Sequence, residues 1–288
     1  MGDIFDNLPI KNIYDVRILS GGDVNEAYKI YSDEGIYFCL IQKNARKNFF
    51  QGEIEGLKLF EENNIRAPRY ISDGKVGDDS YLLLEYLEEA FDGDQRKLAK
   101  LVAKMHRVEN PNGQFGFDYS YEGSKISFSN SYRDTWKEIF LNERMDKLAN
   151  LLSQNGLWGK ERLGTYRKVR EIIAKSLDNH KSRPSLLHGD LWAGNFMFLE
   201  NGEPAIFDPS PLFGDREFDI GISMVFSGFD KNFYQEYNKI YPLEVGYILR
   251  LEFYKLYLLM IHLHKFGKTY MSAVDMEIEK IINKSKIN

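Results

Sequence analysis

The segment His188-Gly189-Asp190-Leu191-Trp192-Ala193-Gly194-Asn195, with Asp208 a further 13 residues along, is the most informative part of the chain. Moving a phosphoryl group from ATP to a hydroxyl needs a carboxylate that accepts the hydroxyl proton, and oxygen ligands that hold Mg²⁺ against the phosphates. An Asp and an Asn five positions apart, then a second Asp after a hairpin, supply these groups. We therefore predict Asp190 as the catalytic base and Asn195 and Asp208 as metal ligands.

The surroundings of this segment separate two interpretations. In the simpler one, the H-G-D triplet is a turn, Asn195 begins a strand and Asp208 caps a loop. A bare H-G-D triplet favours that alternative. Here, short apolar stretches at 185–187, 195–199 and 205–207 flank the polar residues, and a proline follows Asp208. This context favours phosphoryl transfer.

The first 87 residues are dominated by strand patterns. Aromatic and β-branched residues fill 28–31 and 37–41, and the turn-forming residues 32–35 between them predict a hairpin. Apolar residues at helical spacing predict a helix over 50–63. Further predicted elements are a strand at 70–71, a turn over 74–79 and a strand at 81–86.

From residue 88 the pattern changes to helices. An amphipathic helix is predicted at 95–107, and a loop rich in Gly, Asn and Ser covers 110–131. The fold class is therefore α+β, with a small lobe at 1–87, built from an antiparallel sheet and a helix, and a larger, mainly helical lobe at 88–288. Further helices are predicted at 132–153, 160–179, 231–240, 244–266 and 273–284.

The 188–195 segment resembles the catalytic loop of the aminoglycoside-phosphotransferase and protein-kinase-like superfamily, and more narrowly that of the fructosamine kinase (ketosamine-3-kinase) family. It carries the Trp typical of that family, and residues 208–219 are similar to the family pattern D-P-A-x-Y-Y-G-x-R-E-x-D. The resemblance covers about residues 18–268. It also rests on an N-terminal loop, an F-G-G-F-like stretch and a C-terminal helix, at 19–25, 226–229 and 242–267.

This resemblance implies a protein-kinase-like bilobal fold, with 1–87 as the nucleotide-binding lobe and 88–288 as the catalytic and acceptor-binding lobe. It implies ATP and Mg²⁺ as cofactors. It also implies a ketosamine acceptor, a fructosamine or ribulosamine, that is a small molecule or part of a glycated protein. Phosphorylation at the sugar 3-hydroxyl destabilises such an adduct and releases the amine. The sequence leaves the choice among these acceptors open.

Two features of the first lobe are candidates for phosphate binding. The adjacent glycines Gly21 and Gly22 let backbone amides approach phosphate oxygens, although Gly-Gly by itself is usually only a turn. Glu53 lies near the start of the predicted helix. In kinases a helix Glu pairs with a strand Lys that grips the α- and β-phosphates. The alternative for Glu53 is a solvent-exposed residue that favours the helix N-terminus.

The contacts to adenine and to the acceptor are predicted from position. Glu85, Tyr86 and Leu87 follow a buried strand and precede the helical lobe, where a hinge offers main-chain groups to the adenine edge. The alternative is a simple strand exit. We expect the acceptor pocket to draw on 115–133 and on 212–217, where Leu-Phe replaces the family's Tyr-Tyr.

Three further residues are predicted to support the site from behind. His188 is expected to brace the loop by hydrogen bonding, because Asp190 already fills the role of base. Asp219 and Arg216 are expected to anchor the catalytic or the metal-binding loop, in preference to a direct part in the chemistry. Trp192 either packs beneath the loop or lines the acceptor pocket.

The chain departs from the family pattern at one position. The strand Lys is expected 13 residues before Glu53, where this chain has Leu40. Lys43 is close but has the wrong strand parity, and Lys29 on the preceding strand is another possible substitute. Because leucine cannot neutralise phosphate, a nucleotide-binding pseudo-kinase is one alternative. A related small-alcohol or aminoglycoside-type kinase is another.

Composition sets the remaining limits. The 288 residues carry a net charge of −5, which disfavours broad nucleic-acid binding, and the single cysteine, Cys39, excludes an intrachain disulfide. The longest apolar stretch, 256–263, is too short to span a membrane, and no signal peptide is visible. We expect a soluble cytoplasmic protein, with its oligomeric state left open. The predicted structural or surface histidines, without metal-ligand companions at useful spacing, are His106, His180, His262 and His264.

Overall fold

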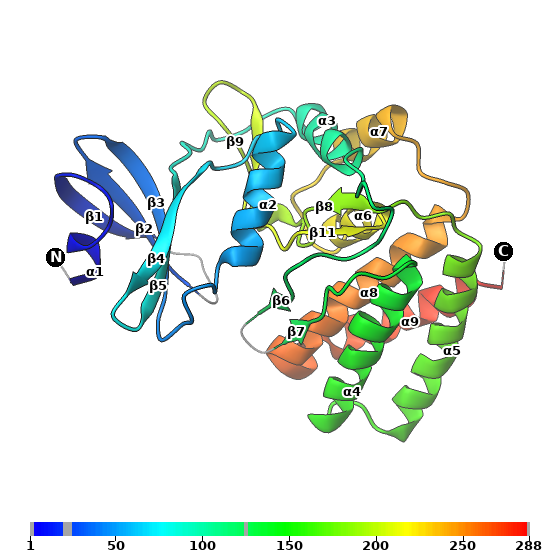
Figure 1. Ribbon diagram of the computed structural model, residues 1–288. Helices are drawn as coiled ribbons and strands as arrows, with labels where there is room; N and C mark the ends of the chain where they lie inside the picture. The colour runs from blue at the N-terminus through cyan, green and yellow to red at the C-terminus, as the bar shows by residue number, and fades with distance from the viewer. Residues whose placement is uncertain (1–2, 20–24, 124–125, 287–288) are drawn as a thin grey trace.

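The computed structural model describes residues 3–19, 25–123 and 126–286, which form two lobes (Figure 1). The N-terminal lobe holds a five-stranded antiparallel sheet with the strand order β1-β2-β3-β5-β4, and α2 lies between this sheet and the helical lobe. Its elements are α1 (Asp3–Asp6), β1 (Ile13–Leu19), β2 (Glu26–Ser32), β3 (Gly35–Gln42), α2 (Gln51–Glu62), β4 (Tyr70–Val76) and β5 (Asp79–Glu85).

The strand patterns of this lobe are confirmed except at one turn. The hairpin predicted at 28–31 and 37–41 is formed by β2 and β3, which pair along their whole length. The turn predicted over 74–79 is wrong, because β4 runs through Gly74 and pairs with β5. A Cβ at Gly74 would lie 2.8 Å from the ring of Tyr81. Glycine here makes room for an aromatic ring within a sheet and does not mark a turn.

The two faces of the sheet bury different apolar clusters. One face carries Cys39 of β3, in a cluster that includes Leu8 and the partly buried residues of α1. The other face carries Leu40, in the cluster that includes Ile54 and Leu57 of α2. Successive side chains of a strand alternate between faces. Leu40 therefore lies on the face that looks toward α2 and the helical lobe.

The helical lobe combines long helices with three short two-stranded sheets, β8 with β11, β9 with β10 and β6 with β7. Its elements are α3 (Gln95–His106), β6 (Tyr121–Glu122), β7 (Ser127–Phe128), the π-helix η1 (Glu138–Met145), α4 (Asp146–Gln154), α5 (Lys160–Asp178), β8 (Ser185–Leu187), the 3₁₀-helix η2 (Ala193–Asn195), β9 (Phe196–Phe198), β10 (Pro204–Ile206), β11 (Leu212–Gly214), α6 (Glu217–Ser223), α7 (Lys231–Ile240), α8 (Tyr247–Phe266), the 3₁₀-helix η3 (Gly267–Tyr270) and α9 (Met271–Lys284).

The predicted helices of this lobe are confirmed, with shifted ends, and one further helix was missed. The helix expected over 132–153 begins as the π-helix η1 and continues into α4. No pattern in the sequence predicted α6. All seven of its residues are buried, so it lacks the polar stripe that produces a helical pattern.

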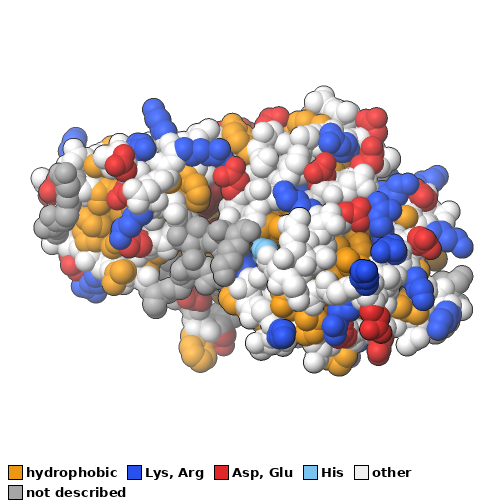
Figure 2. All heavy atoms as spheres, turned by 90° about the horizontal axis from the view of Figure 1, so that it is seen from below, with side chains coloured by type: hydrophobic (Ala, Val, Ile, Leu, Met, Phe, Trp, Pro, Cys, Tyr) orange, Lys and Arg blue, Asp and Glu red, His pale blue; other side chains and the backbone are white. Residues whose placement is uncertain are grey.

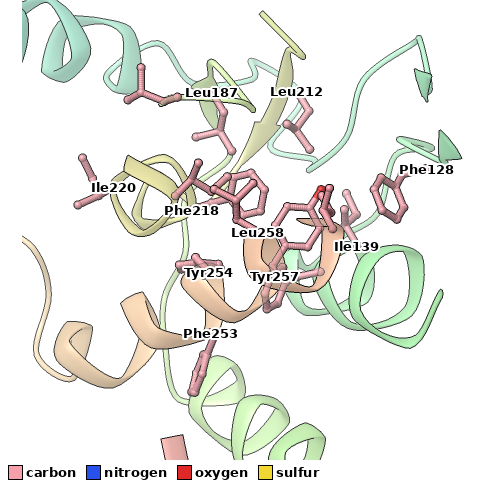
Figure 3. Packing of buried hydrophobic residues seen from close by; sticks show 14 of the residues in the cluster. Phe128, Ile139, Leu187, Leu212, Phe218, Ile220, Phe253, Tyr254, Tyr257 and Leu258 are labelled. Carbon is pink, nitrogen blue, oxygen red and sulfur yellow. The ribbon is translucent and has the colours of Figure 1, made fainter. Parts of the chain in front are cut away.

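The central element of the helical lobe is α8, which is largely buried (Figure 3). The ring of Phe218 on α6 lies 5.6 Å from that of Tyr254 and 5.1 Å from that of Tyr257, measured between ring centroids. Tyr257 also contacts the Phe128 ring of β7 at 6.0 Å. Aromatic packing therefore holds α6 and β7 against α8. Helix α6 also carries Asp219, which supports the catalytic loop.

The surface is mixed in charge. On the face shown in Figure 2, Lys and Arg side chains are interspersed with Asp and Glu. Among the described residues, no helix combines the length and the apolar character that a membrane span requires.

Candidate active site

The predicted catalytic loop joins β8 to β9 and lies against the segment that follows β10. Gly189 has a φ of +80°, and a Cβ there would lie 1.9 Å from the carbonyl oxygen of Ser210. Ser210 donates its backbone N–H to the carbonyl of His188 at 2.8 Å. Only glycine permits this close approach. The approach brings Asp190 and Asp208 close enough for their carboxylates to repel each other.

Asn195 is held by the loop that it ends. It is buried, and its Nδ2 donates to the backbone oxygen of Asp190 at 2.8 Å and to Oδ2 of Asp190 at 3.2 Å. Its side-chain oxygen therefore points away from Asp190. Asp208 has a φ of +55°, a conformation that is rare outside glycine and is concentrated at functional sites. The unusual backbone conformation of Asp208 therefore sets the direction of its carboxylate.

Three carboxylates, those of Asp190, Asp208 and Glu53, lie near one another at this loop. Burial, followed by the charge of Asp208, raises the pKa of Asp190 to about 7. Burial also raises the pKa of Asp208. The pKa of Glu53 is raised well above its usual value, first by burial and then by Asp208. Carboxylate oxygens that repel one another favour a divalent cation such as Mg²⁺, so these residues fit the predicted metal.

Helix α2 delivers Glu53 to this cleft through two glycines. A Cβ at Gly56 would lie 2.6 Å from the ring of Pro211, and one at Gly52 would lie 3.2 Å from Tyr119. These residues are four apart, so they lie on one face of α2. The absence of side chains lets that face approach the loop that carries Asp208, which explains why Glu53 lies near a carboxylate.

The structure places both candidate substitutes for the strand Lys away from Glu53. Leu40 is buried in the apolar cluster described above. Lys43 pairs with Glu26 on the surface. Lys29 shares the sheet face of Leu40, since its cross-strand partner Phe38 is two residues from Leu40. However, its ammonium lies 2.9 Å from Glu88 and 3.8 Å from the centroid of the Tyr86 ring.

His188 and Asp219 hold the catalytic loop from behind. Asp219 accepts the backbone N–H groups of His188 at 2.7 Å and Gly189 at 3.0 Å. The Nε2 of His188 donates to the Phe207 carbonyl at 2.9 Å, so Nδ1 accepts the Asp190 N–H at 3.3 Å. Burial lowers the pKa of His188, which favours this neutral form. His188 therefore lies where a bracing role was predicted.

Arg216 contacts the end of α7. Its guanidinium donates to the Tyr237 hydroxyl at 3.1 Å and to the backbone oxygens of Tyr241, at 3.0 Å, and Pro242. These contacts join the start of α6 to the end of α7. The Tyr237 hydroxyl in turn contacts Nδ1 of His106, whose Nε2 lies 3.1 Å from the carboxylate of Asp219. Since Asp219 holds the catalytic loop, the supporting role of Arg216 from behind stays a prediction.

The predicted hinge residues occupy the exit from β5. The carboxylate of Glu85 pairs with Arg66 at 2.9 Å, and its backbone N–H donates to the Arg69 carbonyl at 2.9 Å. Leu87 is buried with Leu199 and Ala205 of the helical lobe. The main-chain groups of Tyr86 and Leu87 remain candidates for adenine. Gly21 and Gly22 lie outside the described residues.

Two residues that the sequence analysis did not single out belong to the site. Tyr121 of β6 lies near Asp190 and Asp208; burial and then these charges, among others, raise its pKa. Lys265, in the last turn of α8, lowers the pKa of both carboxylates. Tyr121 falls within the predicted acceptor segment. No sequence pattern distinguished Lys265 as a site residue, because a basic residue in the last turn of a helix is common.

One part of the predicted acceptor pocket is wrong. Residues 212–217 are nearly inaccessible, with exposed fractions of 3% for Leu212 and 7% for Phe213. Phe213 packs on Phe117, at 6.5 Å between ring centroids. This segment forms β11 in the core and does not face the cleft. Trp192, in contrast, is 39% exposed, which favours the alternative that it lines the acceptor pocket.

A comparison with protein families decides the assignment. A model of the fructosamine kinase family matches residues 7–284. The chain belongs to the fructosamine kinase family. It is therefore a phosphotransferase, as the catalytic loop predicted, and its fold is the protein-kinase-like one that the resemblance implied.

Individual relatives agree with the family. A probable ketoamine kinase of Staphylococcus aureus is 50% identical over 277 residues, which cover 96% of each chain. A chloroplastic protein-ribulosamine 3-kinase of Arabidopsis thaliana is 30% identical and covers 88% of this chain and 78% of its own length. These relatives do not support the pseudo-kinase alternative.

Solved structures give the same result. The putative fructosamine-3-kinase of Haemophilus somnus superposes with a TM-score of 0.83 at 30% identity, covering 93% of this chain and 91% of its own. The aminoglycoside phosphotransferase APH(4)-Ia has a TM-score of 0.66 at 11% identity, covering 96% and 95%. The second likeness concerns the fold alone.

Proposed function

We propose that the protein is an ATP-dependent kinase that phosphorylates a sugar hydroxyl of a ketosamine, a fructosamine or ribulosamine. The observation that carries the proposal is the convergence of Asp190, Asn195 and Asp208 in one cleft. The names of the relatives, ketoamine kinase and protein-ribulosamine 3-kinase, support this class of acceptor. The cytoplasmic location remains a prediction.

In this proposal Asp190 is the general base. It accepts the proton of the sugar hydroxyl while that oxygen forms a bond to the γ-phosphorus of ATP. The bond from phosphorus to the bridging oxygen breaks, and ADP leaves with the electron pair. A base whose pKa lies near the working pH is suited to this transfer. Asn195 orients Asp190 through the two hydrogen bonds of its Nδ2.

Asp208 and the side-chain oxygen of Asn195 would hold Mg²⁺. When bound, the ion would supply positive charge that offsets the charge of the phosphates. Glu53 lies close enough to Asp208 for its carboxylate to join this charge balance, directly or through water. The role of Glu53 in this chain is then a link between α2 and the metal-binding loop, in place of a link to a strand Lys.

The nucleotide is proposed to bind under the sheet. Residues 1–87 would form the nucleotide-binding lobe and 88–288 the catalytic and acceptor-binding lobe. Gly21 and Gly22 would cover the phosphates, and the main chain of Tyr86 and Leu87 would contact adenine. Among the described residues, no backbone–backbone hydrogen bond engages Tyr86 or Leu87, which leaves these groups for a ligand.

The test is ADP release coupled to NADH oxidation, with Mg-ATP and fructosyl-lysine, ribulosyl-lysine, a glycated protein or an aminoglycoside as acceptor. We expect turnover on a ketosamine, with phosphate at the sugar 3-hydroxyl by ³¹P NMR. Asp190→Asn should lower kcat by about 10²–10⁴-fold while Mg-ATP still binds. Turnover only on an acceptor that is not a ketosamine would overturn the substrate class. An active Asp190→Asn variant would overturn the role of the base.

A further inference from the structure

The support behind the catalytic loop converges on one carboxylate. Asp219 of α6 accepts the backbone N–H of His188 at Oδ2 and that of Gly189 at Oδ1. Its side chain is fully buried, and a third contact comes from another helix, because Nε2 of His106 lies 3.1 Å from Oδ2 of Asp219. His106 is the last residue of α3. One carboxylate therefore joins two helices to the residues that lead into Asp190.

The hydrogen-bond partners of His106 assign the position of its ring proton. Nδ1 of His106 lies 2.7 Å from the Tyr237 hydroxyl, and that hydroxyl accepts an N–H of Arg216 at 3.1 Å. In the described part of the chain, the Tyr237 hydroxyl makes these two hydrogen bonds, so its single proton is donated to Nδ1 of His106. The ring proton of His106 then lies on Nε2, which donates to Asp219.

These four side chains, Arg216, Tyr237, His106 and Asp219, form the His106 network. Each donates one hydrogen bond to the next, from the guanidinium at the start of α6 to the carboxylate behind the catalytic loop. All four are at most 8% exposed. Because bulk water does not reach such groups, a partner that is removed leaves a buried polar atom unpaired. The network is therefore sensitive to the loss of any member.

The bond from His106 fixes the direction of the Asp219 carboxylate. The N–H groups of His188 and Gly189 belong to adjacent residues, so they hold the carboxylate and the loop only relative to each other. The last side-chain torsion of an aspartate is broad, and a donor from α3 restricts its rotation. With this donor, the backbone at 188–189 is held to two helices. The position of Asp190, the next residue, then depends on the same bond.

We propose that His106 is a positioning residue for phosphoryl transfer, whose Nε2–H fixes Asp219 and thereby the place of Asp190 in the cleft. The inference rests on the proposed role of Asp190 as the base. A misplacement of about 1 Å at a reacting group lowers a rate by about 100-fold. The loss of the His106 bond should therefore slow the chemical step and leave the binding of both substrates intact.

The first test compares His106→Leu with His106→Gln. Leucine fills much of the same volume without a polar atom, whereas the glutamine amide places an N–H near the position of Nε2. We expect His106→Leu to lower kcat by about 10–100-fold, with the KM for Mg-ATP and for the ketosamine changed less than threefold. His106→Gln should keep about a third of the wild-type kcat, because it restores the donor. Wild-type kcat in a folded His106→Leu variant, or no gain from Gln over Leu, would overturn the role of the Nε2–H.

A matched pair of hydroxyl deletions separates positioning from stability, and decides the question if His106→Leu does not fold. Tyr237→Phe removes the donor to Nδ1 of His106. Tyr166→Phe is the control, because Tyr166 is also buried and its hydroxyl bonds to Asp146 of α4 at 2.7 Å. Both variants should lower the melting temperature, since each loses one buried hydrogen bond. Only Tyr237→Phe should lower kcat, by about three- to tenfold. Equal kcat values would show that the His106 network supports the fold alone.

The ring nitrogens of His106 give a readout that needs no acceptor. In ¹⁵N-labelled protein without substrates, NMR should show one His106 tautomer, with the proton on Nε2, and Tyr237→Phe should weaken this preference. A proton on Nδ1, or an unchanged tautomer in Tyr237→Phe, would overturn the network. A wild-type enzyme that is silent on every acceptor would overturn the proposed function instead, and the slow hydrolysis of Mg-ATP by water would then supply the rates for the same comparisons.

Discussion

The sheet of the N-terminal lobe and the loop between β8 and β9 differ sharply in chemistry, although both belong to the proposed nucleotide site. The sheet presents Leu40 in an apolar cluster and turns Lys29 toward Tyr86. The loop region gathers Asp190, Asp208 and Asn195, of which Asn195 is buried, Asp190 is partly buried and Asp208 is exposed. We infer that the first lobe contributes mainly shape, whereas the helical lobe contributes most of the charge.

The largest effect is expected at the metal-binding loop. Asp208→Asn should lower kcat by about 10³-fold, the equivalent of several kcal/mol of lost charge stabilisation. Without ligands the same change should raise the melting temperature, because it removes a charge that repels Asp190 and Glu53. Asp78→Asn, on an exposed turn of the first lobe, is the control. A drop in both activity and melting temperature would show that Asp208 supports the fold.

The contact between the lobes is tested at α2. Gly56→Ala places a Cβ 2.6 Å from the rigid ring of Pro211, so it should destabilise the protein by about 1–2 kcal/mol after the gain in helix propensity. Gly164→Ala, in open space on α5, should instead stabilise it by about 0.5–1 kcal/mol. Urea denaturation measures both. Two variants of equal stability would indicate that α2 shifts easily and does not fix Glu53.

A smaller effect is expected from the charge that α2 carries. Glu53→Gln should lower kcat/KM for Mg-ATP by only about tenfold, because Glu53 has no strand Lys to position and reaches the phosphates through the metal-binding loop. Glu62→Gln, exposed on the same helix, should have no effect. Steady-state kinetics at several Mg²⁺ concentrations provides the readout. A loss as large as that of Asp208→Asn would contradict the inference that the helical lobe contributes most of the charge.

The smallest effect is expected in a network of charged side chains around His180 in the helical lobe. His180 lies 3.0 Å from Asp215 and 3.5 Å from Glu244, and Glu217 and Arg250 also act on it. Burial lowers the pKa of His180, but the carboxylates outweigh this and raise it.

A pKa raised by folding adds stability at acidic pH, and this stability is lost as the pH rises through the folded pKa. The difference in unfolding free energy between wild type and His180→Gln should therefore be largest near pH 6 and shrink at alkaline pH. Urea titrations at several pH values measure it. A difference that is constant with pH would contradict an ion pair.

The His180 network also shows what spacing along the chain cannot reveal. From the sequence, His180 has no metal-ligand companions at useful spacing. In the fold, its ligand atom lies within 4.8 Å of carboxylate oxygens of Asp215 and Glu217. The guanidinium of Arg250 already pairs with Glu217 at 2.7 Å, so the group balances charge within the core. The residues meet because β8 and β11 pair, which places the two segments side by side.

Local motifs predicted more of this site than of its surroundings. The Asp190–Asn195 pair is five residues apart, so the loop itself brings these side chains together. Segment 212–217 was misplaced for the opposite reason. Its side chains are buried in the core, and no pattern within 212–217 indicates that β11 is covered on both sides.

The sequence by itself determined the fold class, the family and the core of the catalytic loop, because turn chemistry, periodicity and short motifs act over a few residues. Only the tertiary structure decided that Glu53 lies near Asp208 and that Leu40 lies in an apolar cluster. Glu53 is 155 residues from Asp208 in the chain. Their proximity depends on the close approach of α2 to Pro211, which no pattern over a few residues can specify.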